Sequence, residues 1–201
     1  MPNHVKETAP QRRWLLWLLI AAVVALAGIA VRQAEVERPL YISAREAIEA
    51  GDMTDLEYHL SHGADIHNLD EAGYTLLHTA ARHGRPEVAK LLISKGIDPD
   101  AREPRTLNDY TPLHLAAREN NAAVVQVLIT AGADPDALDA QKRTPLHMAA
   151  LTDAADAARV LLEHGARPNL QDDEEITPLG LAVKWDKSRV GRVMVQYGAK
   201  Q

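Results

Sequence analysis

The tetrapeptide Thr111-Pro112-Leu113-His114 recurs further along the chain as Thr144-Pro145-Leu146-His147. A weakened copy follows at the same interval as Thr177-Pro178-Leu179-Gly180, and a related segment, Thr75-Leu76-Leu77-His78, precedes the first copy. A separate series of glycines keeps the same spacing, at Gly63, Gly96, Gly132, Gly165 and Gly198. Because two unrelated markers keep one period, of about 33 residues, the chain is a repeat protein.

The glycines divide the chain into five units, the last of which is shortened; they span residues 42–74, 75–110, 111–143, 144–176 and 177–201. In the third unit, Thr111 is a suitable helix cap and Pro112 suits the first helical position. The apolar run over residues 124–129 predicts a second helix that ends near Gly132. Neither helix could bury its apolar face alone, so we expect neighbouring units to stack into one continuous core.

The period, the Thr-Pro-Leu-His element and the segment Gly132-Ala133-Asp134-Pro135-Asp136-Ala137 together resemble the ankyrin repeat family. The resemblance covers residues 42–201 and implies an all-α repeat solenoid of helix-turn-helix units joined by β-hairpin loops. At the hairpin tips, Gly73 suits a turn with positive φ, whereas the aligned positions hold Asp109, Lys142 and Glu175. The second hairpin carries a short insertion, and insertions in such arrays often fall on the binding side.

The first unit differs from the others at two positions of its second helix. Asp55 and His59 align with apolar residues in every later unit, at Val88 and Leu92, Val124 and Leu128, Ala157 and Leu161, and Val190 and Met194. Residues four apart share one helix face. We therefore expect a polar end face on the first unit, where no preceding repeat covers it.

Catalytic and metal-binding patterns are absent from the sequence. His59, His62 and His67 lie close together but form no defined ligand set, and the acidic run over residues 172–175 lacks the spacing of a calcium loop, so it is expected to be a solvated hairpin tip. No nucleophile elbow, phosphate-binding loop or dinucleotide pattern occurs, and the chain has no cysteine. The resemblance implies that the motif histidines His78, His114 and His147 have a structural role. We predict a non-enzymatic protein with no cofactor, no metal and no small-molecule substrate.

The charge distribution argues against binding to nucleic acid. The chain has a net charge of −6, but residues 1–32 contain four basic side chains and one acidic side chain. The remaining residues contain 18 basic and 27 acidic side chains, a net charge of −9. Because neutralising phosphates requires a basic surface, a protein partner is the expected ligand of the repeats.

An uncharged, apolar stretch over residues 14–31 precedes the repeats and reaches the lower limit of the length that spans a bilayer. Trp14 and Trp17 lie at its basic end, where aromatic rings favour the membrane interface. The sequence predicts a single transmembrane helix over residues 14–31, a cytoplasmic segment over residues 1–13 and a linker over residues 32–41.

The orientation of this segment depends on the position of its flanking charges. Arg12 and Arg13 adjoin the apolar run directly, so we expect a cytoplasmic N-terminus and extracytoplasmic repeats. The lack of any Asn-x-Ser/Thr acceptor suits a bacterial source, in which the repeats would lie in the periplasm. The alternative is a signal peptide cleaved after Ala27, because Ala25-Leu26-Ala27 matches the small-x-small cleavage pattern. The mature protein would then be a soluble periplasmic protein that assists a secreted enzyme.

Partner contacts in ankyrin arrays commonly come from the exposed ends of the first helices and from the hairpin tips. The helix ends correspond in this chain to Arg82, His83, Arg118, Glu119, Leu151, Thr152, Lys184 and Trp185. The tips correspond to Glu71, Ala72, Tyr74, Arg105, Asn108, Tyr110, Gln141, Arg143, Glu174 and Ile176.

Three aromatic residues of this set, Trp185, Tyr74 and Tyr110, are the best anchor candidates, because aromatic side chains dominate interface energetics. Replacing Trp185 and Tyr110 with alanine is expected to weaken partner binding and to leave stability nearly unchanged. The alternative for Trp185 is a structural role, in which it covers the shortened last unit.

Overall fold

The structure is a computed structural model that describes residues 43–103 and 108–200. Over these residues it contains ten helices, two for each of the five sequence units. The first helices of the five pairs are α2 (Ala44–Ala50), α4 (Leu76–Arg82), α6 (Pro112–Arg118), α8 (Pro145–Thr152) and α10 (Pro178–Lys184). The second helices are α3 (Met53–Ser61), α5 (Pro86–Ser94), α7 (Ala122–Thr130), α9 (Ala155–Glu163) and α11 (Ser188–Gln196).

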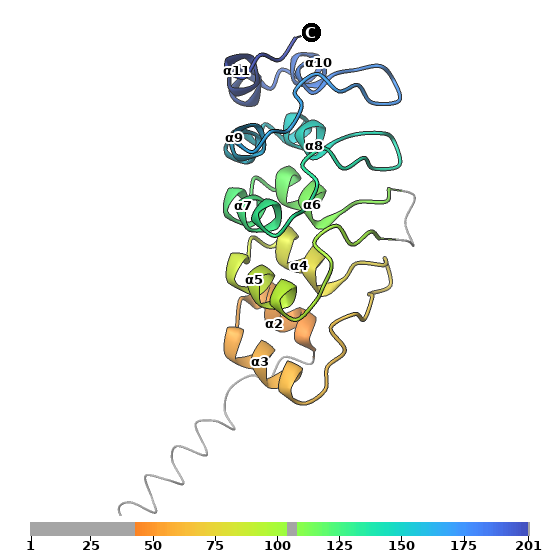
Figure 1. The fold of residues 1–201 in the computed structure, drawn as a ribbon, viewed down its shortest axis with the longest axis vertical. Coiled ribbons are helices and arrows are strands. Elements are labelled where there is room, and N and C mark those ends of the chain that lie inside the picture. Colours follow the sequence, from red (N-terminus) through yellow and green to blue (C-terminus); the bar gives the residue numbers. More distant parts are fainter. Residues whose placement is uncertain (1–42, 104–107, 201) are drawn as a thin grey trace, which may run out of the picture. The chain divides into compact units, whose positions relative to one another are not determined.

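The helix pairs stack in sequence order, so that the repeats form one elongated array (Figure 1). Long loops project from the same side of every pair. The first helices lie beside these loops, and the second helices line the opposite side of the stack (Figure 1). This arrangement confirms the repeat solenoid that the period predicts.

Each motif threonine begins a helix as the sequence predicts. Thr75 and Thr144 accept a hydrogen bond from the backbone N–H three residues later, and the motif histidine at that position accepts one from the threonine N–H. Thr111 and His114 form the same reciprocal capping box at the start of α6. Capping boxes satisfy N–H groups that a helix leaves unpaired at its start, so the repeated tetrapeptide fixes where each first helix begins.

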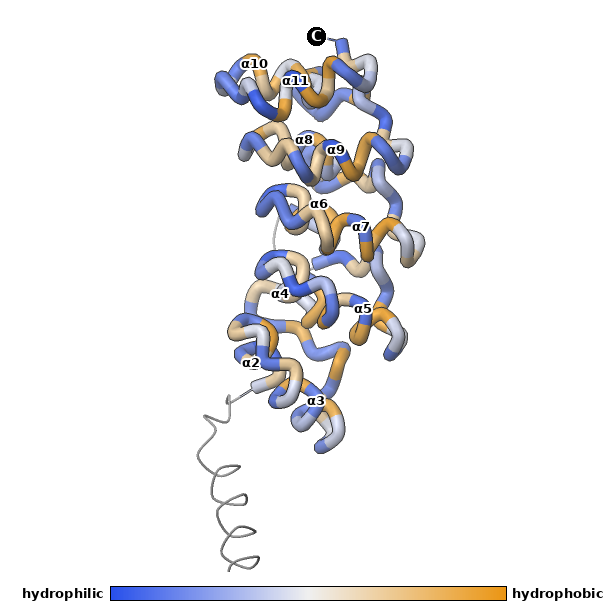
Figure 2. Tube along the Cα trace, turned by 90° about the vertical axis from the view of Figure 1, so that its left-hand side faces the viewer, coloured by the Kyte–Doolittle hydropathy of each residue, from blue (hydrophilic) through white to orange (hydrophobic). Residues whose placement is uncertain are grey.

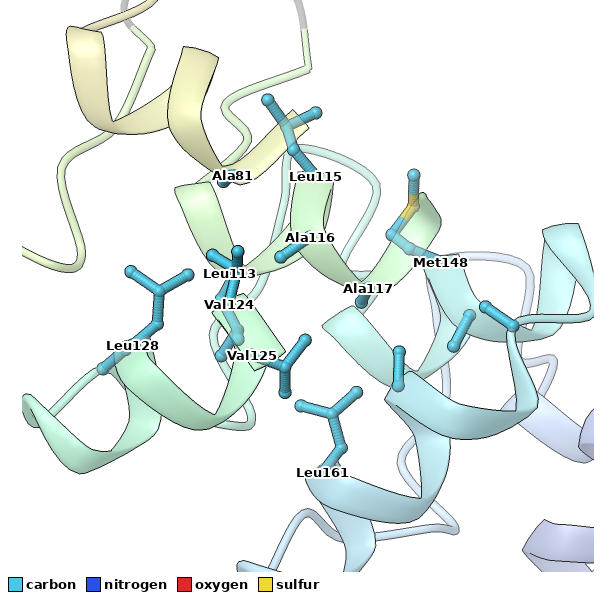
Figure 3. Packing of buried hydrophobic residues seen from close by; sticks show 14 of the residues in the cluster. Ala81, Leu113, Leu115, Ala116, Ala117, Val124, Val125, Leu128, Met148 and Leu161 are labelled. Carbon is cyan, nitrogen blue, oxygen red and sulfur yellow. The ribbon is translucent and has the colours of Figure 1, made fainter. Parts of the chain in front are cut away.

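The core runs through the stack as layers of small and branched apolar side chains. Hydrophobic positions lie along the helices, whereas hydrophilic residues predominate in the loops (Figure 2). In the middle of the array, Leu113, Val125 and Leu161 are fully buried, and Leu161 of α9 points toward Val125 of α7 (Figure 3). Each repeat thus covers apolar groups of the next, which is why no pair would be stable alone.

The long loops are closed by tight turns, and no strand occurs within residues 43–103 and 108–200. In the loop of the third repeat, one backbone hydrogen bond joins the two arms, from the N–H of Asp139 to the carbonyl of Arg143 at 2.9 Å, and the N–H of Lys142 donates to the Asp139 carbonyl at 3.0 Å within the turn. A single closing pair does not make a ladder, so the prediction of β-hairpins is correct for the turn and wrong for regular strands. The four tips share a positive φ, at Gly73, Asp109, Lys142 and Glu175.

Within the described residues, no helix is long and apolar enough to cross a bilayer. The predicted transmembrane helix over residues 14–31, its flanking segments 1–13 and 32–41, and Arg105 lie outside the described residues.

The first repeat is polar at the two predicted positions, but it is less open to solvent than expected. Asp55 is only 7% exposed and His59 is partly buried, and their side chains approach to 4.0 Å. Spaced four apart on α3, they form a pair that occupies the place of two core residues in later repeats.

Candidate protein interface

The structure places the predicted interface residues in three environments. The exposed members are Arg82, His83, Glu119, Thr152, Glu174, Lys184 and Trp185, together with Glu71 of the first tip. The partly buried members are Tyr74, Arg118, Gln141, Arg143 and Leu151, together with Ala72, Asn108 and Ile176. Tyr110 is buried, with 7% of its surface exposed.

The ends of the first helices form a row that runs along the stack. We call His83, Glu119, Thr152 and Trp185 the helix-end row; they are aligned residues at the C-terminal ends of α4, α6, α8 and α10. The Thr152 hydroxyl donates a hydrogen bond to the carbonyl of Arg118, the residue before Glu119, at 2.7 Å, so this bond connects the ends of α6 and α8. The row therefore presents four different exposed side chains from one rigid framework.

At the start of the row, side chains of the first helices and a loop come together. Tyr74, Arg82 and His83 line a narrow cleft with Arg45 of α2. Arg45 donates to the Tyr74 carbonyl at 2.8 Å and forms an ion pair with Asp70 at 3.3 Å. Burial raises the pKa of Tyr74, and the Glu103 carboxylate acts in the same direction. The Tyr74 hydroxyl is therefore a neutral hydrogen-bonding group at physiological pH.

Trp185 lies at the other end of the row. Its side chain is 56% exposed, so it does not cover the last repeat as a core residue would. The adjacent Lys184 forms an ion pair at 3.6 Å with Glu174 of the preceding loop tip. A large exposed ring beside a charged pair is an arrangement typical of interface anchors.

Tyr110 and Arg143 instead belong to the framework. Arg143 donates to the Tyr110 hydroxyl at 3.0 Å and to both Asp139 Oδ2 and Gln141 Oε1 at 2.8 Å. The Asp139 side chain is fully buried and also accepts the N–H of Arg143 at 2.8 Å. Removing Tyr110 would therefore disturb the folded loop, which corrects the expectation that its replacement would be neutral to stability.

One aligned position of the loops is acidic in every repeat that has a loop, at Asp70, Glu103, Asp139 and Asp172, and the sequence analysis did not single out this set. The three aspartates hold their loop tips through side-chain hydrogen bonds. Asp70 accepts the N–H of Tyr74 at 2.8 Å, and Asp172 accepts the N–H of Ile176 at 2.9 Å. Asp172 is buried, whereas Asp173, Glu174 and Glu175 are exposed, so only part of the acidic run is a solvated tip. The sequence feature that could have identified this set is an acidic residue that recurs with the repeat period.

Each motif histidine connects the start of its first helix to the residue just before the next motif threonine. The Nε2 atoms of His78, His114 and His147 lie 3.0, 3.0 and 3.1 Å from the carbonyl oxygens of Tyr110, Arg143 and Ile176, the last residues of their own repeats. Because Nδ1 accepts the threonine N–H, the neutral tautomer protonated at Nε2 satisfies both ends of the ring. Burial lowers the pKa of His78 and of His114 to about 4 and lowers that of His147. These contacts show the structural role that the resemblance implies.

Within the part of the chain that the structure describes, no group of three or more His, Cys, Asp or Glu side chains is placed to hold a metal ion. The buried motif histidines, Asp139 and Asp172 instead form hydrogen bonds that hold helices and loops together.

Comparison with known families matches residues 40–139 and 113–201 to the family described as Ankyrin repeats (3 copies). The chain belongs to the ankyrin repeat family. Protein phosphatase 1 regulatory subunit 27 from Homo sapiens is 46% identical over 56 residues, and its Mus musculus counterpart is 45% identical over the same length. These matches cover 28% of this chain and 36% of each relative, so the chain spans about a third of the relatives it matches.

The family gives the coarse function of this ankyrin array, a protein–protein interaction module with protein partners. The relatives carry the name of a regulatory subunit, which accords with a non-enzymatic role. Both relatives are mammalian, and the comparisons give no support to the prediction of a bacterial source.

Proposed function

We propose that the array binds a protein partner through the helix-end row and the adjoining loop tips. The observation that carries this proposal is a contrast along α4, α6 and α8: the motif histidine at the start of each helix is buried, whereas the helix-end-row residue at its other end is exposed and differs from repeat to repeat. A framework that repeats while its exposed ends vary supports recognition of one particular partner.

The chemistry of the row indicates what kind of surface it would contact. Trp185 offers an apolar anchor, and Arg82, Arg118 and Lys184 offer cations near helix C-termini, with Glu119 among them. Such a mixed surface suits a protein with an apolar pocket and acidic groups around it. The net charge of −9 outside residues 1–32 disfavours nucleic acid as the ligand.

Photocrosslinking in the full-length chain tests this surface directly. A photoreactive amino acid is placed singly at Trp185 and at Glu119, and in matched controls at Lys90 and Arg159, which are also exposed and lie on the second helices α5 and α9. The row positions should give the same discrete protein adduct, which the outer positions should not give. Equal adducts from both surfaces, or none from the row, would contradict the proposal.

We further propose that residues 14–31 tether the array to a membrane with the repeats on the extracytoplasmic side. The uncharged length and the flanking Arg12-Arg13 pair support this placement. A tether would concentrate the array near membrane-bound partners and so raise their effective concentration.

Membrane extraction and intact mass distinguish the tether from a cleaved signal. Full-length protein that resists carbonate extraction, with a C-terminal tag that external protease removes, is the expected result. A soluble exported product that begins near Gly28 would establish cleavage, and protection of the tag in intact spheroplasts would reverse the orientation. Neither outcome bears on the helix-end row, so the two proposals fail independently.

A further inference from the structure

The last repeat presents the face with which every earlier repeat contacts its successor. At one aligned position of the first helices, Ile48, Ala81, Ala117 and Ala150 are fully buried, whereas Val183 of α10 is 56% exposed. On the second helices, Leu162 of α9 is 7% exposed and its counterpart Val195 of α11 is 59% exposed. Among the described residues, nothing takes the place of the following repeat.

This open face is hollowed and apolar at its centre. Leu179, Ala182, Val183, Gly191 and Val195 line a hollow of about 520 Å³. Gly191 aligns with Leu56, Ala89, Val125 and Ala158, all of which are fully buried in their own repeats. A glycine within a helix costs about 1 kcal/mol relative to alanine, although an added Cβ here would meet Leu179 Cδ1 only at an ordinary 3.7 Å. Its effect is to let another backbone approach α11 closely.

Polar side chains mark the register at each of the four internal contacts between repeats. At the first two contacts, the later repeat reaches back: Arg85 donates to the Glu49 carbonyl at 2.6 Å, and Asn121 donates to the Ala81 carbonyl at 2.8 Å. Gly51 and Gly84 leave room for these side chains, because a Cβ at either position would come within 2.8 Å of them.

At the other two contacts, the earlier repeat reaches forward and caps the next second helix. Asn120 Oδ1 accepts the N–H groups of Asp156 and Ala157 at 3.1 and 3.0 Å, and Asp153 Oδ1 accepts the N–H of Val190 at 2.8 Å. Neither α9 nor α11 has a side-chain cap of its own, so these bonds satisfy N–H groups left unpaired at the helix start.

Asp186 is the next member of this forward-reaching series. It aligns with Asn120 and Asp153 and shares their left-handed backbone, with φ of 53°, 57° and 59° respectively. It is exposed at the edge of the hollow, and no hydrogen bond or ion pair engages its carboxylate among the described residues. The open face thus offers an acceptor where a following helix would begin.

We propose that this end face docks a helical hairpin from a different protein, stacked in the register of a further repeat. The second helix of that hairpin would begin at Asp186, an apolar side chain would enter the hollow above Gly191, and acidic groups would face the rim cations Lys187 and Arg192. This surface adjoins the helix-end row at Trp185, but the proposal does not depend on that row.

A second copy of the chain suits this face poorly. A head-to-tail copy would bring the polar pair Asp55 and His59 to the apolar hollow, where burial of polar groups is unfavourable. A two-fold pairing of end faces would bring the rim cations of both copies together. It would also leave the Asp186 carboxylate without a helix start to cap, because the Val190 N–H at the start of α11 in the second copy is already bonded to Asp153.

The test uses the full-length chain with a photoreactive residue at Val195 and a matched control at Gln126 on the outer side of α7. The expected result is an adduct from Val195 alone, with the crosslinked peptide mapping to two consecutive helices of another protein. With that protein purified, Asp186→Ala should weaken binding about tenfold, whereas Asp186→Asn, which keeps the acceptor, should bind as the wild type does.

Several results would overturn the proposal. An adduct between two copies of this chain would make the face a self-association surface, and the same adduct from Gln126 would show that the contact is not specific. Absence of any adduct from Val195, a crosslink to a non-helical segment, or equal affinity of the Asp186→Ala and wild-type chains would each exclude a helical hairpin held by Asp186. Circular dichroism spectra of the exposed-site variants should match the wild-type spectrum.

Discussion

The two ends of each first helix in this ankyrin array lie in opposite environments. At the start of α6, Thr111 and His114 are fully buried and bond to each other, and His114 also bonds to the carbonyl of Arg143 at the end of its repeat. At the end of the same helix, Glu119 is exposed. The buried end repeats along the sequence because every repeat needs the same contact, whereas the exposed end is free to differ. We infer that stability and recognition are separated along a single helix.

The largest expected effect is a loss of folding stability at acid pH, caused by the motif histidines at the buried starts of the first helices. Because folding lowers the pKa of His78 and His114 from 6.5 to about 4, the unfolded chain binds more protons between these values. Stability should be full above pH 6.5 and should fall as the pH drops toward 4, by about 3 kcal/mol for each histidine. Urea unfolding at a series of pH values measures this loss.

A variant of one buried histidine provides the control for that measurement. His114→Gln should be less stable at neutral pH and should show a shallower acid slope, since one titrating group is gone. A slope unaffected by His114→Gln would show that other groups cause the acid sensitivity.

Replacing Tyr110 should give the next largest loss of stability, because its ring is buried in the framework and does not lie at the interface. Tyr110→Ala removes a buried ring and should destabilise the fold by about 3 kcal/mol or more. Tyr110→Phe keeps the ring but loses the hydroxyl that accepts from Arg143, and it should cost about 1 kcal/mol. Thermal unfolding compares the stabilities of the two variants. A Tyr110→Ala variant as stable as the wild type would contradict a structural role for Tyr110.

A smaller effect is expected at Asn120, which connects the third and fourth repeats. Asn120→Ala removes the cap of α9 and places alanine at a φ of 57°, so it should cost about 2 kcal/mol. Asn120→Gly should recover the part due to backbone strain, and Asn120→Asp should restore most of the rest. Chemical denaturation of the three variants separates the cap from the backbone; equal stability of all three would remove the basis for the forward-reaching series.

The sequence predicts the parts of this molecule that repeat, because each repeat faces the same physical requirement. Thr111 and His114 could be assigned from their recurrence, and the tips at Asp109 and Lys142 from their alignment with Gly73. The sequence does not reveal contacts that depend on the neighbouring repeat. The ring of Tyr110 is buried because Arg143, in the next repeat, folds against it, and Asn120 is engaged because α9 begins opposite its side chain.

Under the proposed function, the partner binds the helix-end row and not the second helices. One pair of variants tests this proposal. Trp185 and Tyr197 are both exposed aromatic residues of the last repeat, at 56% and 38%, but Trp185 follows the end of the first helix α10 and Tyr197 follows the end of the second helix α11. Calorimetric titration with the partner identified by crosslinking compares Trp185→Ala with Tyr197→Ala. Trp185→Ala should weaken binding about thirtyfold, about 2 kcal/mol, whereas Tyr197→Ala should bind as the wild type does, with both unfolding midpoints nearly unchanged. Equal losses, or a loss confined to Tyr197→Ala, would contradict recognition by the helix-end row.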